Sequence, residues 1–216
     1  MTAGWSAVAG RSLAVIMVLA SLLTAMPAGA HHPRSPDGTT IGLAIPAIGH
    51  GEMLVVARHR SEIVELAARQ ARTDPTLRRL TGFVSLQHFA CLWGLVPGSL
   101  TDEASPFNEC AHADLAATRA LLAHLATMPG TQSAARALEA RIAAEIAADP
   151  AFAALCSNSS ETFDSGVVVG PDWQLLPSHA PTILTCVLLL LVAASAAWLL
   201  SRVLPAADRR TPSGAA

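Results

Sequence analysis

Residues 88 to 112 read HFACLWGLVPGSLTDEASPFNECAH, and they place two cysteines and two histidines on the two sides of a Pro-Gly loop. A helix precedes this loop, because Asp74-Pro75 combines an N-cap residue with proline at the first helical position. Ser105-Pro106 repeats that combination and predicts that the next helix begins there. The stretch therefore predicts a helix, a loop and a second helix, with one cysteine near each end of the loop.

Cys91 and Cys110 have two candidate roles. Exported cysteines meet an oxidising compartment, so the first prediction is a disulfide between them. Closing a loop of this size would stabilise the fold by about 3 kcal/mol in the chain-entropy model. With His88 and His112 the same cysteines form a Cys2His2 ligand set suited to zinc or copper. Against the metal site, Cys110 and His112 are two residues apart on a predicted helix and would point in different directions.

The helix before the loop carries apolar residues on two faces. One stripe consists of positions 77, 80, 84, 88, 91 and 95, and the other of positions 83, 86, 90 and 93. A helix with two apolar faces is typical of the centre of a bundle. The pattern therefore predicts that this helix is buried on both sides.

The start of the chain is typical of a secretory signal peptide. A run of thirteen apolar or small residues ends shortly before Ala28-Gly29-Ala30, a small-residue motif of the kind that signal peptidases cleave. We expect residues 1–30 to be removed after Ala30, so that the exported chain begins at His31.

A second apolar segment lies near the other end, at residues 181–204. It has a run of twenty uncharged residues, which at about 1.5 Å per residue crosses the roughly 30 Å hydrocarbon core of a bilayer. Arginines follow this run, and the positive-inside rule then predicts a cytoplasmic tail at residues 205–216. We expect a single-pass protein of a bacterial inner membrane whose N-terminal domain lies in the periplasm.

The exported part divides into three predicted segments. Residues 31–50 are rich in proline and glycine and predict an extended arm. For the same reason residues 157–180 predict a juxtamembrane stalk, or alternatively a strap that lies over the bundle. Between them, residues 51–156 alternate helical patterns with short proline or glycine breaks, which favours antiparallel neighbours. The predicted fold class is all-α, a small helical bundle of about four to five helices with one C-terminal transmembrane helix.

Composition and charge exclude one class of partner. The chain has no lysine, which indicates a GC-rich bacterial genome, and residues 31–180 carry ten arginines and fifteen acidic residues. A nucleic-acid-binding domain needs the opposite sign of charge, gathered on one face. We therefore expect no nucleic-acid partner.

Further metal and catalytic motifs are sparse. His31 and His32 at the predicted new N-terminus could chelate copper, and residues 50–53, His-Gly-Glu-Met, carry copper-ligand types where Gly51 and Glu52 also suit the start of a helix. The sequence contains no glycine-rich phosphate loop, H-E-x-x-H, G-x-S-x-G or C-x-x-C-H motif. The sequence gives no positive sign of catalysis, and copper or zinc are the only cofactors it suggests.

The leading functional expectation is an accessory or protein-interaction subunit of an envelope assembly, anchored in the membrane. The loop closed by the cysteines would be displayed to a protein partner through Trp93, Asp102, Glu103 and Phe107. A periplasmic copper-binding or other metal-handling protein is the competing expectation. A membrane-tethered enzyme ranks third.

Overall fold

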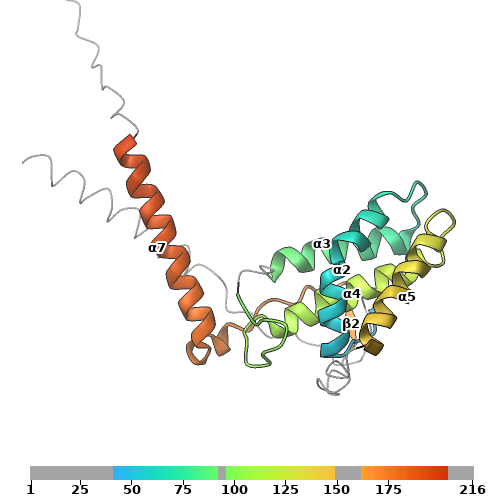
Figure 1. Ribbon diagram of the computed structural model, residues 1–216, viewed down its shortest axis with the longest axis horizontal. Helices are drawn as coiled ribbons and strands as arrows, with labels where there is room; N and C mark the ends of the chain where they lie inside the picture. The colour runs from blue at the N-terminus through green and yellow to red at the C-terminus, as the bar shows by residue number, and fades with distance from the viewer. Residues whose placement is uncertain (1–40, 92–95, 149–161, 204–216) are drawn as a thin grey trace, which may run out of the picture. The chain divides into compact units, whose positions relative to one another are not determined.

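The computed structural model describes residues 41–91, 96–148 and 162–203 (Figure 1). Within these ranges the elements are, in chain order, β1 (Ala44–Ile45), α2 (His50–Ala68), α3 (Pro75–Ala90), α4 (Asn108–Leu125), α5 (Gln132–Ala148), β2 (Phe163–Asp164), the 3-10 helix η1 (Trp173–Ser178) and α7 (Ala180–Val203). The described chain is mostly helical and ends in one apolar helix, which confirms the predicted fold class at that level. The end of the predicted bundle segment, residues 149–156, lies outside the described residues.

The start of α3 follows its sequence signal, whereas the start of α4 does not. Asp74 caps α3, because its carboxylate accepts a hydrogen bond of 2.7 Å from the Leu77 backbone N–H, and Pro75 occupies the first turn. Ser105 instead accepts a 3.3 Å hydrogen bond from the Phe107 N–H within a turn. As a result α4 begins at Asn108, later than the Ser105-Pro106 signal predicts, and has no side-chain cap.

The central helix is α4, not α3. It packs against α2, α3 and α5, and small alanine side chains let these neighbours approach it closely. The main core gathers fully buried residues from α4, such as Leu115 and Leu121, with Met53 and Ile63 of α2. The prediction that α3 is buried on both sides is wrong. The stripe that contains Leu77 faces the core together with Phe83 of the other stripe, whereas Leu86 of that other stripe is exposed.

The predicted arm and stalk pair with one another. β1 and β2 run antiparallel with Ala44 opposite Asp164, although they lie more than a hundred residues apart in the chain. The Asp164 carboxylate accepts a 2.6 Å hydrogen bond from the Ile41 N–H, and the Ser165 hydroxyl accepts one of 2.7 Å from the Leu43 N–H. Residues 163–179 therefore form a strap bound to the folded domain, and we use this name below.

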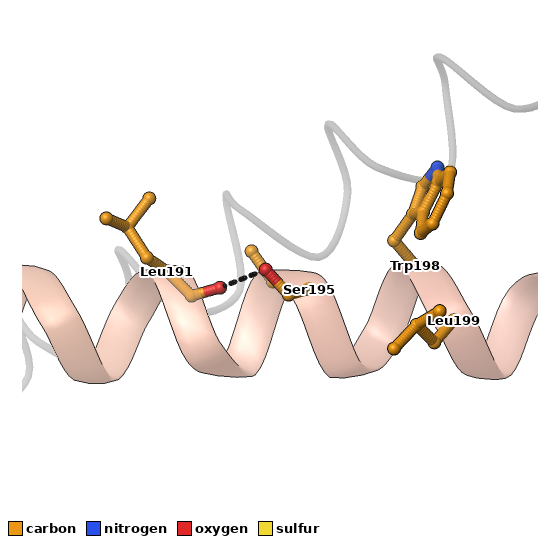
Figure 2. Close-up of a pocket in the computed structure, with 5 residues that line it drawn as sticks. Leu191, Ser195, Trp198 and Leu199 are labelled. Carbon is orange, nitrogen blue, oxygen red and sulfur yellow. Dashed lines mark hydrogen bonds between the residues drawn. The ribbon is translucent and has the colours of Figure 1, made fainter.

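Helix α7 is long and apolar enough to cross a membrane over residues 180–202, and its most apolar stretch of 18 residues is not buried within the chain. Figure 2 shows a hollow on its surface lined by residues that include Leu191, Ser195 and Trp198. Ser195 donates a 2.7 Å hydrogen bond to the Leu191 carbonyl, so its hydroxyl is satisfied inside the helix. Arg202 lies 4.5 Å from the centre of the Trp198 ring, and such aromatic and basic residues suit a membrane interface.

Candidate functional site

Cys91 and Cys110 lie at disulfide distance, with their Cα atoms 5.5 Å apart. Cys91 is the C-cap of α3 and Cys110 lies in the first turn of α4, so the loop at residues 96–107 lies between them along the chain. We call this segment the clamped loop. Val96 and Phe107 are buried against the two cysteines in a second apolar cluster, and Val169 and Trp173 of the strap cover it.

A buried amide binds the strap to α3. Gln87 is fully buried, and its Nε2 donates a 2.7 Å hydrogen bond to the Val169 carbonyl while its Oε1 accepts one of 2.9 Å from the Val169 N–H. The same Nε2 lies 3.2 Å from the Cys110 carbonyl oxygen. The Gln87 amide thus makes the same pair of hydrogen bonds with the Val169 backbone that a neighbouring β-strand would make. Gln87 belongs to neither of the apolar stripes predicted for α3, so the sequence pattern did not predict this contact.

The clamped loop also contacts the residue that precedes α7. His179 is buried, with Nε2 3.0 Å from the Asp102 carboxylate and Nδ1 2.6 Å from the Thr182 hydroxyl. The hydrogen bond from His179, together with one from the Ala104 N–H, lowers the pKa of Asp102 below its usual value. Asp102 therefore connects the clamped loop to the base of α7.

The structure places the four predicted interaction residues in different settings. Phe107 is buried, and its ring meets that of Trp173 edge to face with centroids 5.7 Å apart. Asp102 is held by His179, whereas Glu103 is mostly exposed, and Trp93 lies outside the described residues. Phe107 and Asp102 of the clamped loop therefore contact other parts of the same chain. Among the described members of the four predicted interaction residues, Glu103 is the one that is mostly exposed to solvent.

The predicted Cys2His2 ligands do not converge. Cys91 and Cys110 face one another, while His88 Nδ1 lies 3.2 Å from an oxygen of Asp114 and His112 turns to a different histidine. The physical reason is the helical twist between positions 110 and 112, which directs neighbouring side chains to different faces of α4. His31 and His32 lie outside the described residues.

Asp114 forms a charged group within the bundle. Its side chain is fully buried, and the Arg60 guanidinium donates two hydrogen bonds to it, of 3.0 and 3.3 Å. His88 approaches the same carboxylate from α3, so Asp114 of α4 binds side chains from two other helices. Arg60 also donates a 3.3 Å hydrogen bond to the Val84 carbonyl. This arrangement holds a buried charge in place and offers no nucleophile among the described neighbours.

His112 pairs with His50, the first residue of α2. Their Nε2 atoms are 2.8 Å apart, and the two rings meet at 82° with centroids 4.3 Å apart. Both side chains are buried. Burial, followed by the proximity of His50, lowers the pKa of His112 to about 4, although the Glu103 carboxylate and the Ile48 backbone act in the opposite direction. His112 is therefore neutral at pH 7.

This lowered pKa predicts a loss of stability in mild acid. As the pH falls from 6.5 towards 4, the unfolded chain takes up a proton at residue 112 that the folded chain excludes, so the free energy of unfolding decreases. The decrease in the free energy of unfolding reaches about 3 kcal/mol near pH 4, and above pH 6.5 there is no decrease. We expect urea denaturation of the full chain in detergent to show this decrease. A H112N variant should lose this contribution to the pH dependence, and equal pH dependence in both proteins would contradict the prediction.

The chain matches no family model, no curated protein and no solved structure. Within the described ranges, no group of three or more His, Cys, Asp or Glu side chains is placed to hold a metal ion. Two features of the described residues are suited to binding a partner or a ligand. One is the exposed apolar face of α3, and the other is the histidine pair between α2 and α4.

Proposed function

We propose that this protein is a single-pass bacterial inner-membrane protein that presents its helical domain to the periplasm and serves as an interaction subunit of an envelope assembly. The exposed apolar surface of α7 supports the anchor, and the signal-like start and the arginine-rich end of the sequence support the orientation. We further propose that Cys91 and Cys110 form a disulfide, since their distance allows it and the proposed compartment is oxidising.

The domain is connected to its anchor through several contacts. The strap is held by Gln87 through Val169, by the Pro106 carbonyl, which accepts a 2.8 Å hydrogen bond from the Asp172 N–H, and by Asp102 through His179. The last of these contacts is made by the residue directly before α7. A domain held in this way stays close to its membrane anchor, which favours a partner in the same membrane.

The observation that carries the proposal is an apolar pair on the outer face of α3. Leu86 is 61% exposed and Phe89 is 79% exposed, and their i, i+3 spacing puts them side by side on the helix. Exposed apolar side chains that lie together mark interaction sites. Cys91, at the C-terminal end of α3, packs with Val169 and Trp173 of the strap, so this end of α3 lies beside the segment that leads into α7. We propose that a membrane-embedded protein covers Leu86 and Phe89.

Site-specific photo-crosslinking in native membranes tests this surface. A photoreactive residue in place of Phe89 is expected to give a discrete adduct between this chain and one protein. The matched control carries the same residue in place of Ala137, which is exposed on α5. The adduct should be absent from the control and should disappear when Leu86 is also replaced by aspartate. Equal adducts at both positions, or adducts with lipid alone at position 89, would contradict a protein partner on this face.

A further inference from the structure

The histidine pair between α2 and α4 is an unusual buried feature. The Nε2 atoms of His50 and His112 face each other at 2.8 Å, and such a contact holds when one nitrogen carries a proton and the other offers its lone pair. The His112 side chain is 5% exposed, and its Nδ1 is buried without a well-formed hydrogen bond among the described residues. Nε2 is therefore the His112 ring nitrogen that has a close hydrogen-bonding partner, and this partner is His50.

The surroundings of His50 favour a metal-binding form of its ring. Its Nδ1 lies 3.9 Å from the Glu103 carboxylate. A carboxylate on that side favours a proton on Nδ1, which leaves the lone pair on Nε2, and metal-binding histidines are commonly oriented in this way. When His112 also has its lone pair on Nε2, the two lone pairs point at one another, and a metal cation between them can bind both.

We infer that His50 and His112 bind one monovalent copper ion between their Nε2 atoms, with the Met53 thioether beside it. Met53 is fully buried and follows His50 by three residues on α2, so the two side chains lie on the same face of the helix. Imidazole and thioether are ligands that copper(I) accepts, and thioether sulfur selects this soft ion over harder ones.

Ligand number and charge favour copper(I) over zinc. A structural zinc site takes four ligands, whereas the described residues supply two imidazoles here, and Cys110, two positions from His112, faces Cys91. Burying a single positive charge also costs less than burying two, because the ligands are neutral. The exposed Glu103 carboxylate places negative charge beside His50, where it would attract a cation from solvent.

Binding needs only a small movement. Two metal–nitrogen bonds of about 2 Å in a line separate the nitrogens by about 4 Å, so the pair must open by about 1 Å. His50 can supply this movement because it is the first residue of α2, where Gly49 is the N-cap and forms no side-chain cap hydrogen bond. His112 lies inside the central helix and would stay in place.

Competition titration against a chromophoric copper(I) chelator tests the site. The full chain in detergent carries H31A and H32A substitutions, which remove the paired histidines near the predicted cleavage site, and preformed copper(I) is added under argon. We expect one bound ion per chain. H50N and H112N should each weaken copper binding by about 100-fold or more. A residue that only orients a metal ligand typically changes the affinity by about 10- to 100-fold, so a larger loss indicates a direct ligand. M53L should weaken it less, and the matched control H124N should leave it unchanged.

A second measurement does not depend on the variants folding equally well. Copper(I) is diamagnetic, so NMR of ¹⁵N-labelled histidine in the chain that carries only H31A and H32A should show two Nε2 signals that shift on addition of one equivalent. Equal copper affinity in H50N, H112N and H124N would overturn the site, and so would the absence of shifted histidine signals. Displacement of copper by equimolar zinc would overturn the assignment to a monovalent ion.

Discussion

Replacing Asp114 with asparagine should lower the free energy of unfolding by about 3–5 kcal/mol, the usual cost of removing one partner of a buried ion pair. The Asp114 side chain is fully buried and that of Arg60 is only 15% exposed, so the substitution leaves a guanidinium charge inside the bundle without its counterion. His88 loses the same carboxylate. Urea denaturation of the full chain in detergent, followed by circular dichroism, measures the change.

An exposed ion pair supplies the control. Glu65 and Arg69 of the same chain lie 3.3 Å apart, but both side chains are about 70% exposed, so E65Q should cost no more than about 1 kcal/mol. A double variant, R60M with D114L, removes both charges and should recover part of the loss. If D114N is no more destabilising than E65Q, the carboxylate does not compensate the Arg60 charge.

The sequence predicted the helices well where local chemistry sets their ends. Asp74 and Pro75 begin α3 as expected, and the uncharged run defines α7, because capping and transmembrane length depend on neighbouring residues alone. It was wrong about which helix is central. Two apolar stripes on α3 predicted burial on both faces, but α4 with its small alanine side chains packs against α2, α3 and α5, and Leu86 of the second stripe is left exposed.

The candidate site was less predictable, because it depends on contacts between distant residues. The pairing of His50 with His112 joins positions 62 residues apart, and that of Gln87 with Val169 joins positions 82 apart. No spacing rule within one helix detects such pairs. The sequence did indicate copper-ligand residue types at residues 50–53. The sequence pattern grouped His112 with Cys110 in one ligand set, but the twist of α4 points these two side chains in different directions.

Removing the proposed disulfide should lower the free energy of unfolding by about 3 kcal/mol, because the bond closes a loop of nineteen residues in the unfolded chain. The C91A/C110A variant is compared with the unsubstituted chain by urea denaturation without reductant. The second apolar cluster also loses both sulfur atoms. Hydrogen exchange should therefore rise at the backbone amides of the clamped loop and of strap residues such as Val169, and much less at Leu121 in the main core.

Thiol counting separates this pairing from the alternatives. The chain has four cysteines, so alkylation under denaturing conditions should label Cys156 and Cys186 before reduction and all four cysteines afterwards. Peptide mapping identifies the two protected sites. A C186A variant is the matched control, because this exposed cysteine of α7 lies outside both apolar clusters and its loss should leave stability unchanged. Four labelled thiols before reduction, or a protected Cys156, would contradict the Cys91–Cys110 bond and with it the closed form of the loop that positions Asp102 for His179.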